Sequence, residues 1–313
     1  QRRTCAGTRG QLSVRVRLEV PATSANLGPG YDSYGLALDI VDTLTLTVHD
    51  AAVDPDRCVE VTGESADVLP RDRSHLIMRI IGEVLESEFP DVAADLSPRL
   101  SLECVNRIPH SRGMGSSAAA VVAGIGLAAE LGAWSTGAEL SRDRILEIAT
   151  AVEGHPDNAA PAIFGGLTVS LSAPVKSWQV PVRTLETVTV LVPSFRLDTE
   201  VARGLIPAGI DHAIAADNSA RAGLLVHGLS NDAQVLFEAT RDQLHQEFRR
   251  SAYPDSMALV DSLRAEGLPA VISGAGPTVL VLAEDVPETL VPAGFVAQRT
   301  AIDLGGYRVS REN

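Results

Sequence analysis

Segments with the apolar periodicity of strands and of helices follow one another in an irregular order along this chain of 313 residues. Val14–Val20 and the later part of Leu36–Val48 alternate between apolar and polar residues, which predicts half-buried strands. Ser74–Glu88 repeats apolar residues at helical spacing, with Ser74 as the expected N-cap. A doubly wound parallel sheet needs regular alternation of strands and helices, which these patterns do not follow. We therefore expect an α+β fold, and the length is sufficient for two lobes.

The other elements are predicted from the same periodicities. We expect strands over Leu100–Val105, Leu167–Leu171, Val188–Val192, Ala270–Ile272 and Thr278–Leu282, and helices from Ser116 onward and over Ser141–Val152, Asn218–His227, Asp232–Arg250 and Tyr253–Glu266. Pro21 is expected to end the first strand because proline has no N–H to donate. A break at Gly165-Gly166 would divide an N-terminal lobe (residues 11–165) from a C-terminal lobe (residues 166–313), after a disordered lead-in over residues 1–10.

Charge and apolar content argue against several classes of protein. The net charge is −14 and the basic residues form no stripe or arm, so we expect neither nucleic-acid nor membrane binding. The longest apolar run, Ala118–Leu131, is interrupted by two glycines and a glutamate and predicts a buried helix. Cys5, Cys58 and Cys104 lack the spacing of a zinc site, so free thiols in a reducing cytoplasm are expected. The first ten residues lack the apolar core of a secretory signal.

Lysine is almost missing from the sequence, which excludes two common ways of binding ATP. Lys176 is the only lysine among the 26 residues that are Lys or Arg, and it lies outside any glycine-rich loop. A P-loop needs a lysine within its glycine-rich motif, and a protein kinase needs one on a strand over the phosphates. Phosphate binding here would therefore rest on backbone amides, a helix N-terminus, arginine and a metal ion.

Residues 109–120 (PHSRGMGSSAAA) form a glycine-rich segment that leads into the predicted apolar helix. Gly113 and Gly115 allow the backbone to approach a ligand closely. Ser116 begins the helix, whose N-terminal amides and dipole favour an anion, and the hydroxyls of Ser116 and Ser117 can bind phosphate or Mg²⁺. Arg112 adds a positive charge. The alternative is a loop that only begins a packed helix; a dinucleotide fingerprint is disfavoured because a polar loop precedes the glycines.

The loop at residues 21–32 (PATSANLGPGYD) combines prolines, glycines and small hydroxylated residues after the first strand. Asn26 can donate and accept hydrogen bonds and an ionised Asp32 accepts only, which suits a ligand with an ammonium group and a hydroxyl. The alternative is an ordinary turn in which both side chains bond the local backbone. Residues 273–278 (SGAGPT) predict a glycine turn that lets another backbone approach.

A third loop, residues 153–166 (EGHPDNAAPAIFGG), follows a predicted helix. Pro156 prevents the helix from continuing, so three polar side chains are displayed on a tight turn. These are His155, Asp157 and Asn158. A carboxylate on the preceding helix, Glu147 or Glu153, could face the glycine-rich segment and bind Mg²⁺. The alternatives are a structural histidine and a solvated helix face.

Each loop is weak evidence alone, but their order along the chain is specific. The segments PATSANLGPGYDSYGLAL, IPHSRGMGSSAAA, EGHPDNAAPAIFGG and SGAGPTVL together resemble the GHMP kinase superfamily and, within it, most closely the homoserine kinase family. The resemblance extends from about Ser13 to Leu282. It implies a two-lobed GHMP kinase-like fold with ATP and the substrate in the cleft between the lobes. The implied reaction transfers the γ-phosphate of ATP, with Mg²⁺, to the hydroxyl of L-homoserine, giving O-phospho-L-homoserine for threonine biosynthesis.

The resemblance also assigns roles to single residues. For the nucleotide it implies Pro109, Arg112, Gly113, Met114, Gly115, Ser116, Ser117 and Ala118 and, on the adenine side, His75. For the metal it implies Ser117 and Glu147, since Glu147 lies eleven residues before Asn158, a spacing similar to that of the superfamily's metal carboxylate. For homoserine it implies Asn26, Asp32, His155, Thr199, Arg203 and Arg249, and in catalysis Asn26, His155, Asn158 and Arg203. At the family level a homodimer is implied as well.

The sequence departs from the family pattern at a few positions. Tyr31 and Tyr34 stand where the family usually has Phe and Leu, and Met114 replaces a usual Leu. His75 replaces the Asn of an Asn-Leu pair, which bears on nucleotide preference. Asn158 occupies the place of the general-base Asp of other superfamily members, and an amide cannot take a proton. A loose phosphoryl-transfer transition state tolerates this, so we expect catalysis without a dedicated general base. Two alternatives keep the fold: a kinase for another alcohol, and a non-catalytic sensor.

Overall fold

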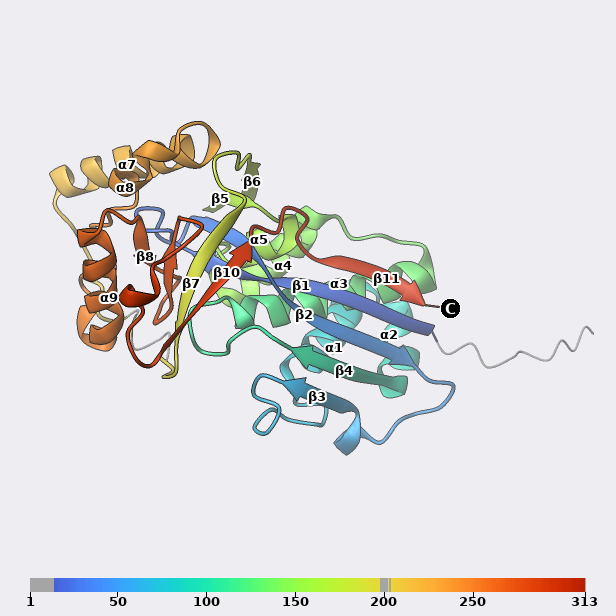
Figure 1. Cartoon of the computed structure of the whole chain (residues 1–313). Coiled ribbons are helices and arrows are strands. Elements are labelled where there is room, and N and C mark those ends of the chain that lie inside the picture. The colour runs from blue at the N-terminus through green and yellow to red at the C-terminus, as the bar shows by residue number, and fades with distance from the viewer. Residues whose placement is uncertain (1–13, 198–201, 203, 313) are drawn as a thin grey trace, which may run out of the picture.

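The larger of two β-sheets combines strands from both ends of the chain in the computed structural model, which describes residues 14–197, 202 and 204–312 (Figure 1). Five strands lie in the order β11-β1-β2-β4-β3, and β5 and β6 extend the sheet from β2. The strands are β1 (Val14–Ala25), β2 (Tyr34–Val48), β3 (Val59–Gly63), β4 (Leu100–Asn106), β5 (Leu167–Ser172), β6 (Val175–Val180) and β11 (Arg308–Glu312). Only β3 and β4 pair in parallel; the other pairs in this sheet are antiparallel.

The second sheet has four antiparallel strands in the order β10-β7-β9-β8. They are β7 (Thr187–Pro193), β8 (Ala270–Ile272), β9 (Val279–Val281) and β10 (Phe295–Ala301), and the accompanying helices are α7 (His212–Ser230), α8 (Leu236–Ala239) and α9 (Pro254–Ala265). The two sheets form separate lobes that lie side by side (Figure 1). The predicted α+β class and two-lobed arrangement are therefore confirmed.

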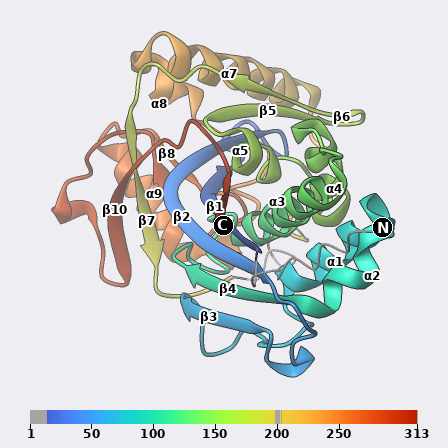
Figure 2. The ribbon, with the colours of Figure 1, turned by 90° about the vertical axis from the view of Figure 1, so that its right-hand side faces the viewer.

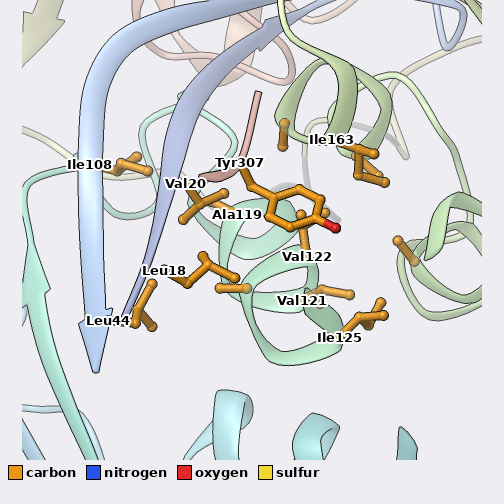
Figure 3. Close-up of a cluster of buried hydrophobic side chains, with 14 of the residues drawn as sticks. Leu18, Val20, Leu44, Ile108, Ala119, Val121, Val122, Ile125, Ile163 and Tyr307 are labelled. Carbon is orange, nitrogen blue, oxygen red and sulfur yellow. The ribbon is translucent and has the colours of Figure 1, made fainter. Parts of the chain in front are cut away.

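Five helices cover one face of the larger sheet (Figure 2). They are α1 (Leu76–Glu88), α2 (Pro90–Leu96), α3 (Ser116–Thr136), α4 (Arg142–Glu153) and α5 (Ala159–Phe164). Helix α3 is apolar on all sides and is long and apolar enough to span a membrane, but most of it is buried in this core, as expected for Ala118–Leu131. It packs on β1, where a Cβ added at Gly126 would approach Leu18 to 2.8 Å and the ring of Tyr307 to 3.2 Å. Figure 3 shows this cluster.

The structure differs from the expected elements in three places. Strand β1 continues past Pro21 to Ala25, because a shift of register between Pro21 and Ala22 accommodates the missing N–H. The N-cap of α1 is His75 rather than Ser74. The predicted helix over Asp232–Arg250 is mostly wrong.

Side-chain hydrogen bonds explain why that helix does not form. Thr240 Oγ1 donates back to the Leu236 carbonyl at the end of α8, and the Asp242 carboxylate accepts from the N–H groups of Leu244, His245 and Gln246. Such local bonds compete with the helical ladder and turn the chain instead. Arg249 follows this turn and is buried, which matters for the site below.

The expected lobe boundary at residue 165 does not coincide with the division between the sheets. β5 and β6 follow that position but join the larger sheet through β2, and β11 returns from the C-terminal end of the chain to pair with β1. The chain therefore passes to the second sheet after β6 and leaves it after β10.

Because α3 packs tightly on β1, truncating a buried side chain at this contact should destabilise the protein strongly. Leu18 is fully buried, so Leu18→Ala should lower the free energy of unfolding by about 2–5 kcal/mol. Leu304→Ala is the matched control, because the Leu304 side chain is 64% exposed and its truncation should change stability by less than about 0.5 kcal/mol. Urea unfolding measures both. Equal losses would contradict this assignment of the core.

Candidate functional site

Four loops that lie far apart in the sequence meet between the two sheets, around the N-terminus of α3. They are residues 21–32, 109–120, 153–166 and 273–278. The Thr23 N–H donates to the Met114 carbonyl (3.1 Å), and the Gly274 N–H donates to the Ala25 carbonyl (3.0 Å). The Asn26 amide Nδ2 also donates to the Gly274 carbonyl (2.8 Å). The segments singled out from the sequence are therefore brought together.

Two glycines make this approach sterically feasible. Gly113 and Gly115 have φ values of 74° and 70°, in the left-handed region that favours glycine. A Cβ at Gly113 would overlap the Ser273 carbonyl oxygen, and one at Gly115 would overlap Thr23 Oγ1. The loop before α3 can therefore touch two other loops only because both positions lack a side chain.

The four loops enclose a pocket of about 390 Å³ at the N-terminus of α3. It is lined by Asn26, Ser111, Gly113, Met114, Gly115, Ser116, Ser117, Ala118, Val152, Glu153, His155, Asp157, Asn158, Arg249, Gly274 and Ala275. The unpaired amides and the dipole of a 21-residue helix point at this space, which favours an anion. Polar groups from all four loops therefore face one anion-binding helix end.

The carboxylate that meets this helix end is Glu153. Ser117 Oγ donates to Glu153 Oε1 at 2.7 Å. Burial is the main cause that raises the pKa of Glu153, and Asp157 adds to it, whereas the Ser117 hydrogen bond and His155 oppose it. A hydroxyl and a carboxylate held together at a phosphate-binding helix end are oxygen donors of the kind that Mg²⁺ prefers. In the described part of the chain no three His, Cys, Asp or Glu side chains are grouped to hold a metal, so further ligands would come from phosphate and water.

Glu147, predicted from its spacing, lies elsewhere. Its half-exposed side chain pairs with Arg144 at 2.9 Å and lines a separate surface pocket. Helix α4 runs to Glu153 and ends at Gly154, so only a short turn separates it from Asn158. Glu147 lies six residues before the end of α4, whereas the carboxylate that meets Ser117 is on the last residue of the helix.

The turn after α4 carries a continuous set of side-chain hydrogen bonds. His155 Nδ1 lies 2.6 Å from Asp157 Oδ1, which also accepts from Asn158 Nδ2 at 3.4 Å. Asn158 Oδ1 in turn accepts from Thr23 Oγ1 at 2.8 Å. Both His155 and Asn158 line the pocket, as expected, and they are held in place by Asp157 and Thr23.

Asn26 and Asp32 occupy the two ends of a tight turn. The Asn26 side chain is buried, and both of its polar atoms form hydrogen bonds within the loops. Nδ2 donates to the Gly274 carbonyl, and Oδ1 accepts from the Asp32 N–H (2.9 Å). Both residues have positive φ, at 69° and 54°. Asn26 thus shapes the pocket wall, and Asp32 is not among the residues that line the pocket.

Arg249 reaches the pocket from the second lobe. It is 1% exposed, donates from Nε to the Ala202 carbonyl (3.1 Å), and lies over the Tyr31 ring, 5.5 Å from its centroid. The neighbouring Arg250 is exposed and pairs with Glu247 and Asp261. A buried guanidinium beside an anion-binding helix end is a strong candidate for binding a carboxylate or a phosphate.

Two other predicted positions do not line the pocket, and two more cannot be placed. Arg112 turns away from the phosphate end of α3: its Nε donates to the Pro193 carbonyl (2.9 Å), and its guanidinium lies 3.6 Å from Glu64. Neither Arg112 nor Pro109 lines the pocket. Thr199 and Arg203 lie outside the described residues. The guanidinium of Arg112 therefore does not face the phosphate end of α3 as predicted, because the Pro193 carbonyl at the end of β7 and Glu64 hold it elsewhere.

A second, largely apolar cavity of about 180 Å³ adjoins the same helix end and shares Ser111, Ser116 and Ser117 with the pocket. His75 lines it, is 4% exposed, and has no hydrogen-bond partner for either ring nitrogen within the described chain. Burial lowers the pKa of His75, so a neutral imidazole faces the cavity. Asp42 lines it too, and burial raises its pKa to about 6.

The sequence did not single out several residues that build the site. Thr23 is one of several small residues in its loop, His110 lies in the glycine-rich segment without a feature that marks it, and Asp42 and His245 lie outside the four loops. His245 Nε2 donates to the Gly28 carbonyl (3.0 Å), and its Nδ1 accepts from the Arg249 guanidinium (3.3 Å). The only signal for Thr23 was its place two residues after Pro21, at the loop that was already suspected.

Models of known families match two stretches of the chain: the GHMP kinases N terminal domain at residues 75–166 and the GHMP kinases C terminal at residues 224–291. A homoserine kinase from Streptomyces avermitilis is 43% identical over 300 residues, which cover 94% of this chain and 95% of that protein. The chain belongs to the homoserine kinase family. A homoserine kinase from Streptomyces coelicolor is 42% identical over 300 residues, with 94% of each chain covered.

A solved structure supports the fold independently. The crystal structure of homoserine kinase from Cytophaga hutchinsonii has a TM-score of 0.78 to this chain and covers 98% of it and 100% of the other chain. Its sequence identity is 22%, so this likeness concerns the fold. The family resemblance drawn from the four loops is confirmed.

Proposed function

We propose that this chain is an ATP-dependent kinase that transfers the γ-phosphate to the side-chain hydroxyl of L-homoserine, giving O-phospho-L-homoserine for threonine biosynthesis. The observation that carries the proposal is the meeting of the family's four loops around the N-terminus of α3, with the Ser117–Glu153 pair at 2.7 Å and the buried Arg249 in one pocket. The identity to curated homoserine kinases over nearly the whole chain supports the substrate.

ATP would lie across both cavities. Its triphosphate would rest on the amides of Gly113–Ala118 at the positive end of α3, where no lysine is needed. Its base would enter the apolar cavity lined by His75, which would give a partner to a buried imidazole that has none among the described residues. The shared lining at Ser116 and Ser117 connects the two parts.

Mg²⁺ would be held by Ser117 and Glu153, in place of the Glu147 expected from spacing. When bound, the ion neutralises charge on the phosphate oxygens. The hydroxyl and carboxylate of this pair already lie within hydrogen-bond distance, so little rearrangement is needed to direct both oxygens at one ion.

For the acceptor, Arg249 would bind the carboxylate of homoserine, together with Thr199 and Arg203. His155 would align the hydroxyl, Asn26 Oδ1 would accept from the ammonium group beside the Asp32 N–H that it already bonds, and Asp32 would add negative charge from outside the pocket lining. A substrate without a carboxylate would leave the buried guanidinium unused, which favours an amino acid over other alcohols.

The reaction would proceed without a dedicated general base. Asn158 stands at the turn beside the phosphate pocket and its amide cannot take a proton. Phosphoryl transfer depends mainly on alignment and on stabilising charge, so the helix N-terminus and the fixed turn would supply most of the effect. We also propose a cytoplasmic enzyme that forms a homodimer and binds neither nucleic acid nor membrane.

The first experiment measures ADP release from Mg·ATP with L-homoserine, compared with L-threonine, L-serine and mevalonate, and repeats it with EDTA. We expect turnover with homoserine alone and its loss on chelation. Turnover with another of these alcohols and none with homoserine would overturn the substrate. Tight ATP binding without any turnover would instead indicate a non-catalytic sensor.

The choice between the two glutamates is tested by a matched pair of variants. Glu153→Gln should raise the Mg²⁺ concentration for half-maximal activity at least about tenfold, because it removes a charged ligand. Glu147→Gln should leave it within about twofold, since Glu147 only pairs with Arg144 on the surface. The reverse ranking of the two variants would contradict the assignment.

The wild type should also need more Mg²⁺ as the pH falls through the raised pKa of Glu153, because protons compete with the metal for the carboxylate. The Glu153→Gln variant should lose this pH dependence.

A further inference from the structure

Asp157 places a buried carboxylate directly under two residues of the pocket. Its side chain is 3% exposed. Its Oδ1 lies 2.6 Å from His155 Nδ1 and 3.4 Å from Asn158 Nδ2, and both partners line the pocket. One carboxylate oxygen therefore contacts both side chains that the turn presents to a ligand.

These bonds fix what each partner can offer. An ionised carboxylate only accepts hydrogen bonds, so His155 Nδ1 must carry a proton to bond it. In the neutral imidazole this leaves Nε2 as an acceptor. Asn158 is fixed in the same way, since its Nδ2 faces Asp157 and its Oδ1 accepts from Thr23 Oγ1 at 2.8 Å. The network thus determines both a tautomer and an amide orientation.

Asp157 differs from the other aspartates that sit in turns of this chain. Asp54, Asp72, Asp211 and Asp232 each accept from the backbone N–H two residues later, which closes their own turn. The hydrogen bonds of the Asp157 carboxylate within the described residues go to side chains alone. A buried carboxylate is costly, so one that stabilises only two pocket side chains indicates a role in the site.

We propose that Asp157 is a positioning residue of the phosphoryl-transfer site. It holds His155 as the Nδ1–H tautomer, so that Nε2 accepts a hydrogen bond from the hydroxyl of the acceptor substrate. It also holds the Asn158 amide in one orientation beside that hydroxyl. The inference rests on the proposed function for the identity of the acceptor, whereas the tautomer rests on the bond between His155 Nδ1 and the Asp157 carboxylate.

The test combines kinetics with ¹⁵N NMR of the His155 ring. Asp157→Asn keeps the shape but can donate as well as accept, so it no longer requires Nδ1–H. We expect kcat with homoserine to fall about 10- to 100-fold, the usual effect of losing a partner that orients a site residue, with KM for ATP nearly unchanged. The neutral ring should change from the Nδ1–H tautomer in the wild type toward Nε2–H in the variant. Asp211→Asn is the control, because asparagine caps α7 as well as aspartate does and Asp211 lies outside the pocket.

Three results would overturn the positioning role: unchanged kcat in Asp157→Asn, a wild-type ring whose neutral form carries the proton on Nε2, or a fall in kcat with no change of tautomer in the variant. The second needs no variant and holds even if Asp157→Asn does not fold. If the wild type shows the Nδ1–H tautomer but turns over no homoserine, the proposed function fails while the orienting role of Asp157 toward His155 stands. A fall in kcat with an unchanged tautomer would reduce Asp157 to a structural residue.

Discussion

The close approach of the end of β1 to the start of α3 is the constraint on which the rest of the site depends. Thr23 bonds the Met114 carbonyl through its N–H and Asn158 through its hydroxyl, so one residue joins three loops. This contact exists only because Gly115 has no Cβ to overlap the Thr23 hydroxyl. Since α3 is buried along most of its length, its N-terminus cannot shift to relieve a clash, and the loops must fit around it.

The groups that can bind phosphate and a metal gather where β1 meets the N-terminus of α3. A fixed helix end supplies amides and a positive dipole, which replaces the lysine that other ATP-binding folds use. Glu153 and Ser117 present side-chain oxygens at the same point, where we propose the metal, and Arg249 brings a buried positive charge from the other lobe. The site is therefore shared by two sheets, and neither lobe contains it alone.

The sequence predicted which segments form the site, but it did not predict where some of their side chains point. Glycine, proline and serine spacing identified all four segments, because backbone conformation at such residues is determined locally. The direction of Arg112 depends on carbonyls of β7, which lies about eighty residues later, and no local pattern reports that. The exchange of Glu147 for Glu153 is similar, since the carboxylate that meets Ser117 is on the last residue of α4.

Long-range pairing and competing side-chain bonds limited the prediction of the fold. The return of β11 to β1 joins residues almost three hundred positions apart, and short exposed strands of this kind carry weak periodicity. The segment over Asp232–Arg250 has helical spacing, yet Thr240 and Asp242 bond the backbone and turn it. Arg249 lies at the end of this irregular segment and lines the pocket, which the helical spacing did not predict.

The most direct test is a crystal structure of the chain with Mg²⁺, a non-hydrolysable ATP analogue and L-homoserine. The account predicts Mg²⁺ at about 2.0–2.1 Å from oxygens of Ser117 and Glu153, the triphosphate on the N-terminus of α3, and the homoserine carboxylate on Arg249 with its hydroxyl beside His155 and Asn158. A metal bound at Glu147, or homoserine bound away from the pocket where the four loops meet, would contradict it.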